Sequence, residues 1–121
     1  MDRYTLTDYY QWSRQRDSYV VVKEIGGMIV AVMHFTVHNT YIVLEMLARN
    51  KAYGHPGAGG DLVRLLEWKL APTLGIQEIQ MEAMAQVVKY YDDDLGYVHY
   101  GEPFEDSEWG RLTPKMKRLV P

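Results

Sequence analysis

The chain has no cysteine among its 121 residues, which excludes disulfides, thiolate catalysis and cysteine-ligated zinc sites. It has no apolar run long enough to span a bilayer, and its start lacks the features of a signal peptide. The formal net charge is −3 and no basic stripe follows a helix, which argues against binding to nucleic acid. We therefore expect a cytoplasmic protein that binds neither nucleic acid nor a membrane.

The four histidines do not have the spacing of metal ligands, and no metal is expected. Hydrophobic residues make up 47% of the sequence and charged residues 24%, which is typical of an ordinary globular protein. The length suits one domain with a real core. With no repeat or linker in view, we predict a single domain spanning 1–121.

The first half of the chain alternates valine-rich segments with short turn signals. Gly26-Gly27 and His38-Asn39 are typical of tight turns, so the segments that they join form an antiparallel meander. A capping box at Thr5 to Asp8 predicts an opening helix. The predicted elements are a helix from Thr5 to about Asp17 and strands at Tyr19–Ile25, Met28–Val37 and Thr40–Ala48.

The second half predicts helices alternating with strands. A helix from about Gly60 to Leu70 ends near Pro72 and Gly75, and the next strand would lie parallel to Tyr41–Leu47 through a right-handed crossover. The further predictions are a strand at Ile76–Met81, a helix whose apolar face carries Met84, Val87, Val88 and Tyr91, a strand at Tyr97–Tyr100 and a last strand near Arg111–Leu119, which Pro114 disfavours. The fold class is mixed α+β, an antiparallel meander with one splayed parallel pair, flanked by helices.

A glycine-rich segment, Gly54 to Gly60, lies between a predicted strand and a predicted helix. Glycines let several backbone N–H groups approach one anion, and the start of a helix favours negative charge. The segment therefore indicates a site for a phosphate-bearing ligand. A flexible loop that simply leads into a helix is the open alternative.

Three segments in this order resemble the GCN5-related N-acetyltransferases, over roughly Gly26 to Tyr100. Gly57-Ala58-Gly59-Gly60-Asp61-Leu62-Val63 is similar to the family's pyrophosphate loop, Arg/Gln-x-x-Gly-x-Gly/Ala. Leu74-Gly75-Ile76 is similar to the step from the family's helix into its next strand. Tyr90 to Tyr97 is similar to its Phe-Tyr-Glu-Lys-Leu-Gly-Phe segment. The resemblance implies the family's central mixed sheet and an acetyl-CoA-dependent N-acetyltransferase, a short and divergent member.

The chain departs from the family pattern at several places. Gly54 stands where the loop motif has Arg or Gln, so that His55 or Arg49 would have to supply the contact. Met84 replaces an Asn that is frequent in the second helix. The interval from Tyr91 to Gly96 is one residue longer than usual, and the amino-terminal part has one helix where the family usually has two.

The resemblance implies acetyl-CoA as co-substrate and assigns its contacts. Backbone N–H groups at the helix start would bind the pyrophosphate, and the end of the Thr40–Ala48 strand would pair with the pantetheine amides and offer an N–H to the thioester carbonyl. The implied cofactor-binding residues are Leu47, Ala48, Arg49, Gly54, His55, Gly57, Ala58, Gly59 and Gly60.

Two catalytic roles follow from the same resemblance. Tyr91 would protonate the leaving thiolate, since a phenol is protonated at neutral pH; a core aromatic is the alternative reading, and Tyr90 takes the role if the extra residue shifts the register. Glu45 is the candidate base, because strand alternation places it with Val43 and Leu47 among apolar neighbours that would raise its pKa. A surface carboxylate paired with a cation is the alternative there.

The implied acceptor is an amine, on a protein or a small molecule. The acidic run Asp92-Asp93-Asp94 favours a basic acceptor or partner, and a homodimer stays open. Two other functions remain. A non-catalytic acyl-CoA-binding or regulatory protein would suit the departures at Gly54 and Met84. A nucleotide-binding domain is the third, although the loop lacks both the P-loop ending and the dinucleotide spacing.

Overall fold

The computed structural model describes residue 11 and residues 14–50 and 57–119. Within them, a seven-stranded sheet has the strand order β1-β2-β3-β4-β7-β5, and β6 pairs with β7. None of the described helices is both long and apolar enough to span a membrane. The strands are β1 (Ser18–Ile25), β2 (Met28–Val37), β3 (Ile42–Arg49), β4 (Glu78–Met84), β5 (Val98–His99), β6 (Phe104–Asp106) and β7 (Gly110–Arg118).

The strands that follow β3 in the sequence are connected by helical segments. A continuous helical stretch comprises α2 (Ala58–Leu65), a π-helical turn at Leu66–Leu70 and α3 (Ala71–Thr73). It ends in a left-handed Gly75, with Ile76 N–H bonded to Ala71 C=O at 2.9 Å, which is a typical helix stop. A short 3₁₀ turn, Ala85–Val87, precedes α4 (Val88–Asp93).

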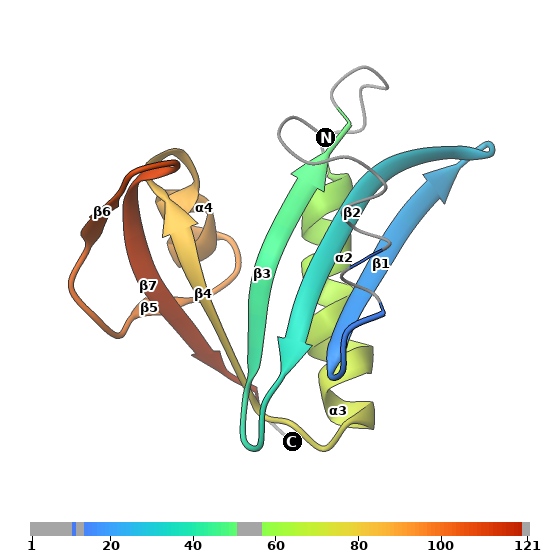
Figure 1. Cartoon of the computed structure of the whole chain (residues 1–121), viewed down its shortest axis with the longest axis horizontal. Helices are drawn as coiled ribbons and strands as arrows, with labels where there is room; N and C mark the ends of the chain where they lie inside the picture. Colours follow the sequence, from blue (N-terminus) through green and yellow to red (C-terminus); the bar gives the residue numbers. More distant parts are fainter. Residues whose placement is uncertain (1–10, 12–13, 51–56, 120–121) are drawn as a thin grey trace.

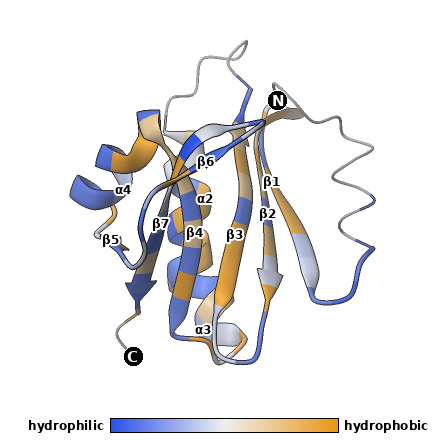
Figure 2. Cartoon of the chain, turned by 60° about the vertical axis from the view of Figure 1, so that its left-hand side comes forward, coloured by the Kyte–Doolittle hydropathy of each residue, from blue (hydrophilic) through white to orange (hydrophobic). Residues whose placement is uncertain are grey.

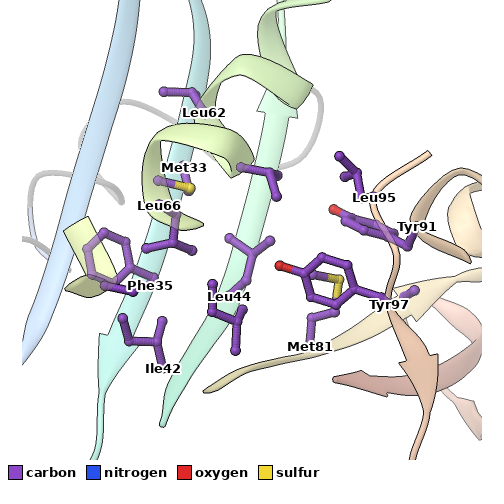
Figure 3. Close-up of a cluster of buried hydrophobic side chains, with 14 of the residues drawn as sticks. Met33, Phe35, Ile42, Leu44, Leu62, Leu66, Met81, Tyr91, Leu95 and Tyr97 are labelled. Carbon is purple, nitrogen blue, oxygen red and sulfur yellow. The ribbon is translucent and has the colours of Figure 1, made fainter. Parts of the chain in front are cut away.

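The meander β1–β3 and helix α2 enclose the apolar core. Because side chains alternate across a strand, β2 places Met33 and Phe35 on the face that α2 covers (Figure 1). Leu62 and Leu66 of the helical stretch meet them there (Figure 3). All four side chains are at most 3% exposed, so the meander is stabilised chiefly by apolar burial.

The strands β3 and β4 are parallel and separate soon after they pair. Their register runs only through Ile42↔Ile79, Val43↔Gln80 and Leu44↔Met81, and Figure 1 shows the two ribbons diverging beyond this point. The predicted α+β class, the meander and the splayed parallel pair are all confirmed.

The predicted helix through Met84, Val87, Val88 and Tyr91 is wrong at its start. Met84 has extended backbone and ends β4, where it pairs with Leu112 of β7. Strand pairing therefore overrides the apolar spacing, and of that predicted stripe only Val88 and Tyr91 lie in α4. The strand predicted at Tyr97–Tyr100 is reduced to β5, and β6 was not predicted.

The opening helix predicted from Thr5 to about Asp17 lies mostly outside the described residues. Gln11 is helical, but residues 14–17 form turns rather than helix. Asp17 has φ 56°, a left-handed conformation that Asp tolerates better than most residues, and β1 begins directly after it.

The last strand forms in spite of Pro114. The carbonyl of Pro114 accepts a bond from Tyr100 N–H, so the position where its own N–H would be faces β5 and β6 rather than β4. That stretch of β7 lies between its pairing with β6, which ends at Leu112, and its pairing with β5, which begins at Lys115. A missing donor therefore costs no ladder bond to β4.

Candidate functional site

A cavity of about 690 Å³ occupies the region where β3 and β4 diverge. This volume is in the usual range for small-molecule sites. The cavity reaches the start of α2, helix α4 and the loop before β7, and its lining residues include Glu45, Leu47, Arg49, Gly59, Gly60, Glu82, Tyr90, Tyr91, Tyr100, Asp106 and Trp109. The divergence of the parallel pair therefore coincides with the main candidate site in the described part of the chain.

The start of helix α2 leaves backbone donors available at one end of this cavity. The first N–H groups of a helix have no intrahelical partner, and Gly57 at the N-cap makes no side-chain cap bond. Gly59 and Gly60 line the cavity, so their N–H groups lie at its wall. Such an arrangement is suited to an anion.

Helix α4 approaches α2 closely at Gly60. A Cβ at this position would collide with the hydroxyl of Tyr90 and would lie 3.1 Å from Arg64 Nη1. The absence of a side chain at Gly60 therefore lets the Tyr90 hydroxyl lie against the helix start, and any larger residue would displace it. Arg64 is held near by Asp61, 3.9 Å from its guanidinium, and Asp61 is itself bound by Lys23 at 2.6 Å.

Tyr91 lies in the core and at the cavity wall at the same time. Its ring packs edge-on against Tyr90 and Tyr97, with centroids 5.7 Å and 5.5 Å away, and Figure 3 shows its side chain beside Leu95. Burial, and then the neighbouring Tyr90, raise the pKa of the Tyr91 phenol. The group therefore stays protonated at neutral pH and is able to donate.

Glu45 sits on a β-bulge. The register of β3 with β2 shifts between Leu44 and Met46, which leaves Glu45 as the extra residue, a device that re-aims side chains near sites. The bulge corrects the predicted alternation, since Val43 pairs with Thr36 whereas Leu47 packs on the core side.

The environment of Glu45 also differs from the prediction. Its side chain is exposed rather than buried among apolar neighbours. Its carboxylate accepts a hydrogen bond from Thr36 Oγ1 at 2.8 Å, and among the described residues no lysine or arginine forms an ion pair with it.

Acidic and aromatic side chains gather on the far side of the sheet from α2. Tyr100 hydroxyl donates to Gln80 Oε1 at 3.4 Å. Burial raises the pKa of Tyr100, with further contributions from the carboxylate of Glu82, from Tyr41 and from Glu78. Glu82 and Asp106 line the same cavity, so this side carries negative charge while the opposite end offers helix donors and Arg49.

The cavity unites several of the predicted site residues. Glu45, Leu47, Arg49, Gly59, Gly60 and Tyr91 line it, whereas Ala48 does not. Gly57 is exposed and Ala58 is buried at the first turn of α2. Gly54 and His55 lie outside the described residues.

Glu82, Tyr100 and Trp109 line the cavity, and Arg64 lies beside Gly60. The sequence analysis singled out none of them for the site, because they belong to no recognised motif. A signal existed only for Arg64, whose position four residues after Gly60 places it over the same helix face. In the part of the chain that the structure describes, no three histidine, aspartate or glutamate side chains gather as metal ligands would.

No family model and no curated protein sequence matches the chain. Solved structures do. Ard1 from Thermoplasma volcanium is 13% identical, with a TM-score of 0.81 over 100% of this chain and 84% of that one. PaiA N-acetyltransferase from Thermoplasma acidophilum, in complex with coenzyme A, is 15% identical, with a TM-score of 0.71 over 94% and 69%.

A GNAT family acetyltransferase from Elizabethkingia anophelis, with acetyl-CoA bound, is 12% identical, with a TM-score of 0.69 over 94% and 81% of the two chains. These likenesses extend over nearly the whole chain, and they agree with the splayed parallel pair described above. The chain has the fold of the GCN5-related N-acetyltransferases, as the resemblance in its sequence predicted.

Proposed function

We propose that this chain, as one domain, is an acetyl-CoA-dependent N-acetyltransferase that moves an acetyl group directly to a primary amine. The observation that carries the proposal is the cavity between β3 and β4, which has helix donors at one end and carboxylates at the other. That arrangement suits an anionic cofactor and a cationic acceptor that meet where the strands diverge. The structural neighbours that hold coenzyme A or acetyl-CoA support the same cofactor here.

The pyrophosphate would bind at the start of α2. The N–H groups of Gly57, Ala58, Gly59 and Gly60 would supply donors, and Arg64 or Arg49 the positive charge that Gly54 lacks. Leu47 and Ala48 of β3 would offer backbone to the pantetheine, since β3 loses its partner β4 beyond Leu44. His55 remains a proposed alternative source of the pyrophosphate contact that Gly54 lacks.

The chemistry removes two protons from the acceptor ammonium and delivers one to the leaving thiolate. The acceptor ammonium gives a proton to the Glu45 carboxylate, the free amine attacks the thioester carbonyl, and the Tyr91 hydroxyl protonates the leaving thiolate. The acylated nitrogen then loses its second proton to the Tyr91 phenolate, which restores the phenol. The raised pKa of Tyr91 keeps the phenol proton in place until the thiolate forms. Glu82 and Asp106 would attract the cationic amine, which favours a basic acceptor.

The first test is calorimetric titration with acetyl-CoA, with CoA, ATP and NAD for comparison. We expect acetyl-CoA and CoA to bind, and ATP and NAD not to bind. Gly59→Glu should weaken CoA binding by about tenfold, which is about 1.4 kcal/mol, because the carboxylate lies where the pyrophosphate would be. Gly59→Gln has the same bulk without the charge and should lose less. Equal CoA affinity in the wild type and Gly59→Glu would place the cofactor elsewhere.

The proposed acid is tested by a matched pair of tyrosine variants. Tyr91→Phe should lower kcat by roughly 100-fold with acetyl-CoA affinity unchanged, while Tyr90→Phe should stay close to the wild type. The reverse pattern would transfer the role to Tyr90, whose hydroxyl rests on Gly60. Acetyl-CoA binding with no turnover on any amine would instead support the non-catalytic acyl-CoA-binding protein.

A further inference from the structure

A row of polar contacts leads away from Glu45 along the sheet, on the side opposite α2. Thr36 Oγ1 donates to Glu45 Oε2 at 2.8 Å, and His38 Nε2 lies 3.1 Å from the same Thr36 oxygen. The His38 ring stacks on Tyr41, with centroids 4.7 Å apart and planes 9° apart. Four side chains are thus connected from the proposed base to the turn between β2 and β3.

The chemistry of the groups fixes the direction of these bonds. An ionised carboxylate can only accept, so the single hydroxyl hydrogen of Thr36 is used on Glu45. The Thr36 oxygen must then accept from His38, which requires a hydrogen on Nε2. A His38 ring bare at Nε2 would compete with Glu45 for the hydroxyl hydrogen.

Thr36 and His38 are themselves held in place. Thr36 is β-branched, so its χ1 is restricted, and it is half-buried in β2 opposite Val43 of β3. His38 is fixed by the stacking and by its backbone N–H, which donates to the Tyr41 carbonyl at 2.8 Å. Glu45 is exposed, as His38 is, but it lies on a bulge and has a long flexible side chain. It therefore gains most from a fixed donor.

We propose that Thr36 and His38 are positioning residues that hold the Glu45 carboxylate in one orientation toward the acceptor amine. The inference rests on the proposed function, in which Glu45 takes the proton of the ammonium. A proton path to solvent is not needed, because Glu45 is exposed. Once protonated, its carboxyl group releases the proton directly to water. The row therefore acts on geometry, to which proton transfer is sensitive.

The kinetic consequence separates this role from a structural one. The Thr36 side chain lies on the face opposite α2 and the proposed pyrophosphate site. Loss of its hydroxyl should therefore lower kcat and leave the KM for acetyl-CoA unchanged. A general loss of folding would move both quantities and the unfolding midpoint together.

Thiol release from acetyl-CoA, with spermidine and a short lysine-bearing peptide as acceptors, tests the role of Thr36. Thr36→Val should lower kcat by about tenfold, and Thr36→Ser, which keeps the hydroxyl, should restore it. Thr36→Val at the wild-type kcat, or Thr36→Ser as slow as Thr36→Val, would overturn the proposal.

The same assay tests His38. His38→Gln places an N–H near the position of Nε2 and should be faster than His38→Phe, which keeps the stacking but has no donor. A His38→Gln variant no faster than His38→Phe would remove His38 from the proposal.

Two kinds of NMR spectra of the whole protein give readouts that need no acceptor. Long-range ¹H–¹⁵N spectra report the hydrogen on the His38 ring, and spectra of the side-chain scalar couplings report the rotamers of Glu45. We expect His38 to carry hydrogen on Nε2, and Glu45 to occupy one side-chain rotamer in the wild type and several in Thr36→Val. A His38 ring bare at Nε2, or a Glu45 rotamer unaltered by Thr36→Val, would contradict the proposed row. No thiol release by the wild type would reject the proposed function, and these spectra alone would then decide whether Thr36 holds Glu45.

Discussion

The two halves of the sheet are stabilised in different ways. On the β1–β3 side, α2 covers a surface of aliphatic and aromatic side chains such as Met33 and Phe35. On the β4–β7 side, the buried contacts include ions: Glu67 accepts from the Tyr97 hydroxyl and from Lys117, both at 2.9 Å. Figure 2 shows the contrast, with β3 mainly hydrophobic and the end of β7 hydrophilic.

A second buried ion pair reinforces the difference. Lys115 of β7 is 0% exposed and pairs with Asp92 of α4, while Lys117 also donates to the Leu95 carbonyl at 2.7 Å. These directional contacts hold α4, and with it Tyr90 and Tyr91, onto the second half. The strands of the two halves pair only briefly, while Glu67 of the helical stretch joins the halves through Tyr97 and Lys117. The cavity therefore opens at a seam between two walls that differ in their contacts.

The largest effect on the free energy of unfolding is expected from a substitution in the apolar half. Phe35→Ala removes a ring that is 2% exposed and stacks on Tyr19 at 5.3 Å, which should lower the free energy of unfolding by roughly 3–5 kcal/mol. Urea unfolding measures this loss. It should be nearly the same at low and high salt, and a strong salt dependence would contradict an apolar origin.

The polar half should respond asymmetrically to its two partners. Asp92→Asn leaves the Lys115 ammonium buried without its counter-charge and should cost about 3 kcal/mol. Lys115→Met should cost less, because Asp92 keeps 35% of its side chain in contact with solvent. Asp94→Asn, at an exposed neighbour, is the control in the same urea experiment. Equal losses of unfolding free energy for Asp92→Asn and Lys115→Met would contradict the idea that an unpaired buried ammonium costs more than an unpaired Asp92 carboxylate.

The same contrast explains what could be predicted from the sequence. The meander follows from valine-rich segments and glycine turns, which are local signals, and its bounds were nearly right. The start of α4 was misplaced because Met84 suits a helix face by spacing, while its pairing with Leu112 is a long-range contact that spacing does not reveal.

The candidate site was predictable only where a motif carried it. Gly59 and Gly60 in the first turn of α2 and the Tyr90-Tyr91 pair were found by resemblance, and all four line the cavity. The place of Glu82 and Tyr100 in the site, and the bulge at Glu45, depend on how distant strands pair. No local sequence pattern therefore predicts them. Buried Lys115 is a further example, since its partner Asp92 lies on another element.

A smaller effect is expected at the seam itself. Gly60→Ala adds a Cβ that collides with the Tyr90 hydroxyl, whereas the ring carbon bearing that hydroxyl would lie 3.6 Å away. The variant should lose about 1 kcal/mol of stability, and Tyr90→Phe in the same chain should restore most of it. Gly57→Ala, which meets nothing within 4 Å, is the control. No recovery in the double variant would show that the two halves do not meet through this contact.

The smallest effect on stability concerns His34, a buried histidine of the apolar half. His34 bonds to Ser18 Oγ at 2.8 Å; burial lowers its pKa, and the charge of Glu45 offsets part of that shift. Because the folded pKa is below the unfolded value of about 6.5, the unfolded chain binds more protons between the two. Stability is therefore complete above about pH 6.5 and falls as the pH drops toward the folded pKa. Urea unfolding between pH 7.5 and 5, with His34→Gln as reference, measures this term (roughly 1.4 kcal/mol per unit of pKa difference). A stability difference between the two proteins that stays constant with pH would mean that protonation of His34 costs the folded state nothing.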